Sequence, residues 1–229
     1  MTVLESTLYA DRPRSVMTEV ERIVNCGYTG RDEAAVEAHI EELAREGIAS
    51  PEEFPTLYPK PAHLLSTADR MEVLGDRTSG EAEFVLFVTA DGVYVGVGSD
   101  HTDRDLETDD VPLAKVVCPN AVGPDLWWLP DIEDHWDDLE LRSWAVENGE
   151  RVLYQETTLD AVLPPDELLA LAESNVRAPL AGTALFSGSV ATETDGLVCG
   201  ERFEVELRDP VLDRRLACKY DIRVVGGLT

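Results

Sequence analysis

Lysine is scarce in this sequence, and basic residues as a whole are few. Lysine occurs only at positions 60, 115 and 219, and 19 basic residues face 46 aspartates and glutamates. The formal net charge at pH 7 is −27. Because phosphate groups and anionic lipids are bound by clustered Lys and Arg, this balance argues against nucleic acid or a membrane surface as the partner.

Further absences narrow the class of protein. The four cysteines have no C-x-x-C spacing, which argues against a zinc knuckle or a redox pair and predicts reduced, mostly buried thiols. The N-terminus lacks a basic segment followed by an apolar run, and no stretch reaches the roughly 20 apolar residues of a membrane span. We therefore expect a soluble, cytoplasmic protein.

The composition that remains is that of a folded protein adapted to high salt. Apolar residues make up 44% of the 229 residues, which is enough for a sizeable core. The acidic residues are spread along the whole chain and do not form a tail. Since salt screens the repulsion between like charges, we interpret this dispersed excess as salt adaptation, typical of a halophile, and not as a functional site.

Residues 1–65 are predicted to form a small helical appendage with a linker. Asp32 can cap a helix that runs to about Glu46, whereas residues 1–25 fit a strand or a helix equally well. Four prolines between positions 51 and 61 indicate an extended linker. The main domain is then expected to cover residues 66–229.

The main domain is predicted to consist mostly of strands. A tight-turn signal separates residues 84–89 from 93–97, and Asn148-Gly149 marks a hairpin between residues 139–146 and 151–155. A short helix follows Pro164, and alternating apolar residues predict two last strands near 203–207 and 216–224. No strand–helix alternation and no Gly-rich phosphate loop is present, which disfavours a doubly wound nucleotide fold. The predicted fold class is α+β, mainly β.

Three carboxylates lie at the ends of two neighbouring predicted strands. Glu81 and Glu83 are two residues apart, so their side chains point to the same face of the sheet. Asp100 ends the next strand, after V-G-V-G-S. Such oxygen ligands suit Mg²⁺, Mn²⁺ or Ca²⁺. In so acidic a protein, however, the same residues can also be solvated surface groups.

Basic residues follow this cluster directly. His101 could act as a base, although neighbours on a strand point to opposite faces. Arg104 and Lys115 come next in the sequence. Lys115, one of the three lysines, can be either a solvated surface residue or a functional residue.

In order and spacing, these residues resemble the fumarylacetoacetate hydrolase superfamily, and within it a branch known only as a domain of unknown function. The resemblance covers about residues 79–224. It is carried by the glutamate pair, the S-D-H-T-D-R-D segment at 99–105, Lys115, the G-P at 123–124, the S-G-S at 187–189 and G-E-R-F-E-V-E-L at 200–207. It implies a mixed β-sandwich roll and a homodimer.

The resemblance also implies roles for the site residues. Glu81, Glu83 and Asp100 would bind the metal, Mg²⁺ first among the candidates. Lys115 would polarise or protonate a small oxo-acid substrate, Arg104 would bind its carboxylate, and Ser189 and Gly188 would contact it. A cation chelated by a 2-oxo or β-diketo acid stabilises an enolate, which suits C–C hydrolysis, decarboxylation, hydration or tautomerisation.

The sequence also departs from the family pattern. Ser99 replaces an asparagine, Glu107 a glutamine and Ser189 a threonine. Family hydrolases activate water with a histidine–acid dyad, but neither His63 nor His101 matches that motif. Two hypotheses therefore stay open: a metal-dependent hydrolase or lyase, and a non-catalytic member of the fold that binds a small carboxylate.

Overall fold

The structure, a computed structural model, describes residues 1–10, 12–45 and 49–226. Within these residues ten strands join one mixed sheet: β1 (Thr2–Tyr9), β2 (Arg14–Val20), β3 (Arg22–Gly27), β4 (Thr56–Pro61), β5 (Leu65–Ser66), β8 (Ala82–Val88), β9 (Val93–Asp100), β11 (Asn120–Val122), β12 (Asp125–Trp128) and β15 (Thr183–Phe186). The second sheet contains β6 (Arg70–Val73), β13 (Glu140–Glu147), β14 (Glu150–Thr158), β16 (Arg202–Asp209) and β17 (Arg214–Val224). Outside these sheets lie the short ladder of β7 (Thr78–Ser79) with β10 (Thr102–Asp103), several short 3-10 helices and the α-helices α1 (Glu33–Arg45), α2 (Arg104–Glu107), α3 (Val111–Val116) and α4 (Pro165–Asn175).

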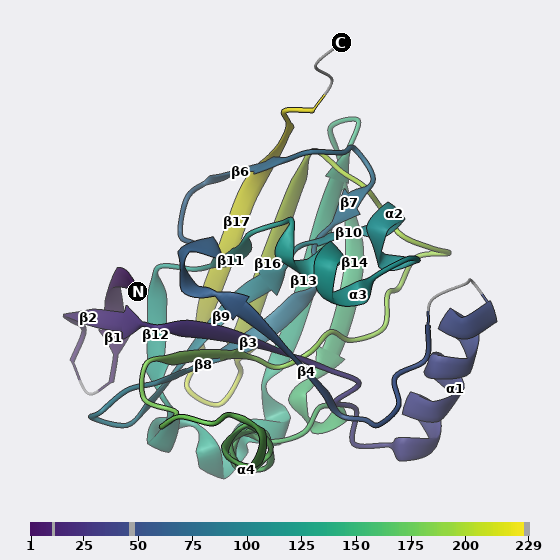
Figure 1. Cartoon of the computed structure of the whole chain (residues 1–229). Coiled ribbons are helices and arrows are strands. Elements are labelled where there is room, and N and C mark those ends of the chain that lie inside the picture. The colour runs from purple at the N-terminus through teal and green to yellow at the C-terminus, as the bar shows by residue number, and fades with distance from the viewer. Residues whose placement is uncertain (11, 46–48, 227–229) are drawn as a thin grey trace.

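The two sheets pack against each other and curl, with the helices at the periphery (Figure 1). The larger sheet runs in the order β2-β1-β12-β9-β8-β15-β3-β4, and β11 and β5 extend it beside β9. The second sheet has the order β14-β13-β16-β17-β6. The helices α2 and α3 pack against each other and against the β7–β10 ladder, whereas α1 stands at the side of the molecule (Figure 1). This arrangement confirms the prediction of a mainly β, α+β fold.

The prediction of a helical N-terminal appendage is wrong for residues 2–27. These residues form β1, β2 and β3, and both β1 and β3 pair in parallel with strands from the later chain, β12 and β15. The physical reason is the two-residue alternation of β1, which buries Leu4, Ser6 and Leu8 and leaves Glu5 exposed and Thr7 half-buried between them. The predicted linker near residue 58 is likewise a strand, β4, which lies at the edge of the larger sheet. An edge strand tolerates proline, because the missing N–H can face the side on which no strand pairs.

Other local predictions are confirmed. The α1 helix begins after Asp32, whose side chain accepts hydrogen bonds from the backbone N–H groups of Ala34 and Ala35. Its predicted end at Glu46 lies outside the described residues. The β13–β14 hairpin turns at Asn148 and Gly149, which have φ values of 53° and 77°, as a turn that matches the twist of two strands requires. All four cysteines are free, and three of them are buried.

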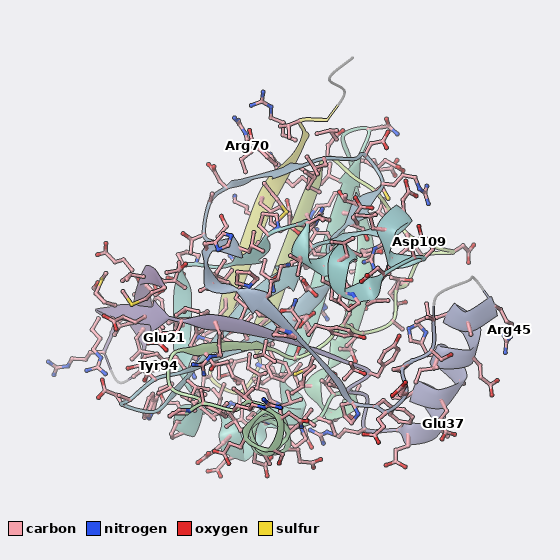
Figure 2. All side chains as sticks on the ribbon, viewed as in Figure 1. Glu21, Glu37, Arg45, Arg70, Tyr94 and Asp109 are labelled. Carbon is pink, nitrogen blue, oxygen red and sulfur yellow. The ribbon has the colours of Figure 1, made fainter. Side chains whose placement is uncertain are left out.

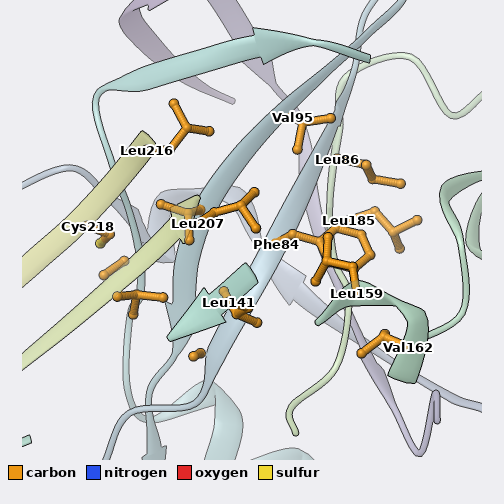
Figure 3. Packing of buried hydrophobic residues seen from close by; sticks show 14 of the residues in the cluster. Phe84, Leu86, Val95, Leu141, Leu159, Val162, Leu185, Leu207, Leu216 and Cys218 are labelled. Atoms are coloured by element: carbon orange, nitrogen blue, oxygen red, sulfur yellow. The ribbon is translucent and has the colours of Figure 1, made fainter. Parts of the chain in front are cut away.

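Both faces of β8 are buried, each in its own apolar cluster. Phe84 and Leu86 face the second sheet, where they join Leu141 and Leu207, as Figure 3 shows. The alternate residues of β8 face a smaller cluster enclosed by the curl of the larger sheet. Burial of each such large side chain contributes about 1.5–3 kcal/mol. Apolar packing on both faces therefore fixes the position of β8 without help from the polar residues at its end.

The acidic excess lies mainly at the surface. Figure 2 shows the labelled Glu37 and Asp109 pointing outward, and both are exposed, as is Glu21. The described part of the chain contains no helix that is both long and apolar enough to cross a membrane.

Candidate metal centre

Strand alternation sends Glu83 and Asp100 to the same face of the larger sheet. On β8, Glu83 has the parity of Val85, and on β9, Asp100 has the parity of Tyr94; both Val85 and Tyr94 belong to the smaller apolar cluster. Glu83 lies opposite Gly98, so no side chain of β9 stands beside it. This face is therefore apolar along most of its length and becomes acidic at one end.

Glu81 completes a group of three carboxylates. It directly precedes β8, and its carbonyl oxygen accepts a hydrogen bond of 3.2 Å from the backbone N–H of Asp100, which ties the two strand ends together. One oxygen from each of Glu81, Glu83 and Asp100 lies within 4.8 Å of the others. Glu83 and Asp100 are fully buried, and the side chain of Glu81 is 14% exposed. The structure thus brings together the three predicted metal ligands.

Lys115 bridges two of these carboxylates. It lies on α3, which begins with an Asp110 cap. Its Nζ lies 2.9 Å from Oε2 of Glu81 and 2.7 Å from Oδ2 of Asp100. The Lys115 ammonium therefore places a positive charge in contact with two of the three carboxylates.

Three side chains accept hydrogen bonds from Arg104. Its Nε donates to Ser79, and one terminal nitrogen donates to Glu81 at 2.9 Å and to Glu107 at 2.7 Å. The expected role of Arg104, binding of the substrate carboxylate, stays a prediction. In the structure Arg104 is hydrogen-bonded to Glu81 and Glu107.

The pKa values of Glu83 and Glu81 are shifted in opposite directions. Burial, together with the charges of Asp100 and Glu81, raises the pKa of Glu83 well above its ordinary value. Burial also acts on Glu81, but the cations Lys115 and Arg104 outweigh it and lower the pKa of Glu81 to about 2. Burial would lower the pKa of Lys115, yet Asp100 and Glu81 raise it well above its ordinary value. The site therefore holds the charged Lys115 and, near it, Glu83, whose negative charge the neighbouring groups do not fully compensate.

The loop at 187–189 contacts Glu83 from the other side. The backbone N–H of Gly188 donates to Oε2 of Glu83 at 2.7 Å. Gly188 has a φ of +91°, and a Cβ there would come within 2.5 Å of the Thr29 hydroxyl, so only glycine suits this position. The Ser189 hydroxyl accepts a hydrogen bond of 2.9 Å from Gln155. Of the two predicted substrate-binding residues in this loop, Gly188 thus contacts a carboxylate of the cluster, and the exposed Ser189 is its neighbour in the chain.

The donor set fits a hard divalent cation. Oε1 of Glu83 is buried, and no described residue offers it a hydrogen bond. An unpartnered buried carboxylate oxygen is costly, and a divalent cation bound by three carboxylates would satisfy it. Glu81, Glu83 and Asp100 are the residues that would hold the ion.

The sequence analysis missed Lys60. Its Nζ lies 3.3 Å from Oδ1 of Asp100 and 2.5 Å from Oδ1 of Asn120, whose amide nitrogen donates to Asn25 at 2.8 Å. Lys60, Asn120 and Asn25 are all buried. Lysine scarcity was a signal that could have found it, but Lys60 lies far from the carboxylates in sequence, and strand pairing alone brings it there.

His101 does not join the site. Its ring nitrogens lie 2.9 Å from the hydroxyls of Tyr220 and Thr78, on the opposite face of β9 from Asp100. Burial, reinforced by Arg104 and Lys60, lowers the pKa of His101 to about 3, so the ring is neutral. The proposed role of His101 as a base is therefore not supported, because strand alternation turns it toward the second sheet.

Comparison with known protein families assigns the chain to one of them. The family described as "Protein of unknown function (DUF2848)" matches residues 26–220, and the chain belongs to this family. No curated protein matches the sequence.

Several solved structures share the fold. A 2-keto-3-deoxyarabinonate dehydratase is 15% identical, with 96% of this chain and 79% of that chain covered and a TM-score of 0.69. Cg1458 is 18% identical, with coverages of 97% and 88% and a TM-score of 0.61. A putative fumarylacetoacetate hydrolase family protein from Yersinia pestis is 17% identical, with coverages of 90% and 94% and a TM-score of 0.58. These similarities confirm the fumarylacetoacetate hydrolase-like fold that the sequence motifs indicated.

Proposed function

We propose that this protein is a metal-dependent enzyme that acts on a small 2-oxo or β-diketo carboxylic acid. The observation that carries the proposal is the buried three-carboxylate cluster, in which Oε1 of Glu83 has no partner among the described residues. A further support is a solved structure of the same fold, that of 2-keto-3-deoxy-D-arabinonate dehydratase complexed with magnesium and 2,5-dioxopentanoate.

Charge balance favours an anionic substrate. Four carboxylates, those of Glu81, Glu83, Asp100 and Glu107, face three cations, those of Lys60, Arg104 and Lys115. If all are ionised the cluster carries one negative charge, so a divalent cation would leave it with one positive charge. A monoanionic oxo acid then makes the site neutral, and burial penalises any other total.

The residues of the chain have distinct roles in this proposal. A bound divalent cation, Mg²⁺ first among Mg²⁺, Mn²⁺ and Ca²⁺, would supply Lewis-acid stabilisation of negative charge on the substrate oxygens. Lys115 would donate a hydrogen bond or a proton to the oxo acid. Arg104 holds Glu81 in place, and Ser189 offers its hydroxyl to the substrate. Because His101 faces the second sheet, reactions without an activated water (decarboxylation, dehydration, tautomerisation) are favoured over hydrolysis.

Calorimetry with Mg²⁺, Mn²⁺ and Ca²⁺ tests the metal site, and assays with oxaloacetate, acylpyruvates and 2-keto-3-deoxy sugar acids test the reaction. Glu81→Gln should weaken metal binding and remove metal-dependent turnover. Asp105→Asn is the matched control, because Asp105 is a nearby exposed carboxylate that pairs with Arg77. Equal metal binding by wild type and Glu81→Gln would contradict the proposal. Metal binding without turnover of any acid would favour the non-catalytic carboxylate-binding alternative.

The homodimer implied by the family resemblance stays a prediction, which light scattering on the purified protein tests.

A further inference from the structure

Two of the three lysines converge on one carboxylate. Lys60 contacts Oδ1 of Asp100 and Lys115 contacts Oδ2, at 3.3 Å and 2.7 Å. Their side chains are 1% and 8% exposed, whereas Lys219 is exposed on β17. Two buried ammonium groups on one carboxylate repel each other, so their common position calls for an explanation.

Lys60 is fixed by its surroundings. It lies on β4, and it is hydrogen-bonded to Asn120 on β11, which is in turn hydrogen-bonded to Asn25 on β3. These three strands belong to the larger sheet. Because the neutral Asn120 amide oxygen also accepts a hydrogen bond from Lys60, the position of Lys60 does not depend on Glu81 or Glu83.

Lys115 has a different setting. It lies on the six-residue helix α3, outside both sheets, and among the described residues its ammonium donates hydrogen bonds to Glu81 and Asp100 alone. A divalent cation needs carboxylate oxygens at about 2.0–2.6 Å. An ion held by Glu81, Glu83 and Asp100 therefore competes with Lys115 for the same lone pairs and repels its charge.

An alternative resting place for the Lys115 ammonium is nearby. The Tyr58 ring centroid lies 5.8 Å from Nζ, within the range of a cation–π contact. The ring has room because Gly27 lies beside it: a Cβ on Gly27 would come within 3.0 Å of the ring.

On the basis of the proposed function, we propose that Lys60 is a positioning residue that stays on Asp100, whereas Lys115 is an exchangeable counter-ion that a divalent cation displaces from Glu81 and Asp100. The displaced Lys115 then faces the oxo acid. The two lysines thus divide the oxygens of Asp100: Lys60 retains Oδ1, and Oδ2 is released to the metal. This division explains why a site for a cation already contains an ammonium group.

Chemical labelling of the three lysines tests this division. Amine acetylation followed by mass spectrometry resolves each lysine, with Lys219 as the internal control. In chelator, we expect Lys60 and Lys115 to be protected and Lys219 to react. With Mg²⁺ added, the labelling of Lys115 should rise several-fold, while Lys60 stays protected and Lys219 is unchanged.

Calorimetry on the same samples separates the two proposals. Mg²⁺ binding with no rise at Lys115, or with new labelling at Lys60, overturns the exchange and leaves the proposed function intact. No binding of Mg²⁺, Mn²⁺ or Ca²⁺ overturns both.

Lys115→Met gives a second measurement that a merely structural lysine would not move. Because the ion then displaces no ammonium, Mg²⁺ should bind more tightly than to wild type, and Lys219→Met should bind it as wild type does. Unchanged or weaker binding by Lys115→Met overturns the exchange.

Discussion

Asp209 and Glu83 are both fully buried acids, but their surroundings differ. Asp209 ends β16, and its carboxylate accepts hydrogen bonds from the backbone N–H groups of Val211 and Leu212, at 3.0 and 2.9 Å, and from Arg214, and contacts His135. Glu83 accepts one hydrogen bond, from Gly188, and its other oxygen has no partner among the described residues.

The difference separates an acid that stabilises the fold from an acid that is available to a ligand. Burial opposes ionisation of Asp209, but the backbone donor at Leu212, His135 and Arg214 lower its pKa. At Glu83 the single backbone donor does not offset burial and the neighbouring carboxylates, so the pKa is raised. For these two acids, complete hydrogen bonding of Asp209 indicates a structural role, and incomplete hydrogen bonding leaves Glu83 available to a ligand. Four substitutions test this comparison.

Asp100→Asn should have the largest effect on stability. Asp100 is buried like Glu83 but has two cationic partners, and loss of one partner from a buried ion pair costs about 3–5 kcal/mol. Urea unfolding of the metal-free protein measures the change in the free energy of unfolding. A loss as small as that of an exposed ion pair would show that the lysines are not held by Asp100.

Glu83→Gln should act on metal binding and not on stability. We expect the affinity for Mg²⁺ to fall about 100-fold, or about 2.7 kcal/mol, because a ligand is lost. The metal-free protein should be as stable as wild type or more so, since an under-compensated buried acid is removed. Calorimetry and urea unfolding, with Asp105→Asn as the control, measure both quantities. Destabilisation of the metal-free protein would place Glu83 with the structural acids.

Asp209→Asn should show the reverse pattern, with a loss of about 1–3 kcal/mol in the free energy of unfolding and unchanged metal affinity. The pH dependence has a definite sign. A lowered folded pKa stabilises the protein above the unfolded carboxyl pKa of about 3.9, and this stability is lost as the pH falls through the folded pKa. Acidification through this window should therefore narrow the difference between wild type and Asp209→Asn. A difference that stays constant with pH would contradict the assignment.

Glu156→Gln should have the smallest effect. Glu156 pairs with Arg142 across β13 and β14, with both side chains at least one-third exposed, and such pairs contribute about 1 kcal/mol or less. The effect should shrink further with added salt, which thermal unfolding at two salt concentrations measures. The salt adaptation predicted from the composition itself stays a prediction, which the same series on wild type tests.

Local chemistry made much of the fold predictable. The apolar runs at residues 84–89 and 93–97 on either side of a tight turn, the Asn148-Gly149 turn and the Asp32 cap each act over a few residues, and the structure has each of them. The first strands were less clear, because β1 and β3 are completed by pairing with β12 and β15, more than a hundred residues away. A short amphipathic stretch alone does not choose between helix and strand when its partner lies so far along the chain.

The candidate site divides in the same way. The spacing of Glu81, Glu83 and Asp100 and the period of a strand were sufficient to predict three converging carboxylates and to cast doubt on His101 as a base. The contacts of Lys60 and Asn25 were not predictable, because β3 and β4 reach the carboxylates only through the order of strands in the sheet.

The sequence by itself determined the class of fold, the acidic surface and the identity of three carboxylates, because propensity, charge and strand period are local properties. Only the tertiary structure decided which cations those carboxylates meet. Lys115 bridges two of them and Arg104 is committed to Glu81 and Glu107, while Lys60 enters from a distant edge strand. Burial then gives each contact its strength, because charges taken out of water must find partners within reach.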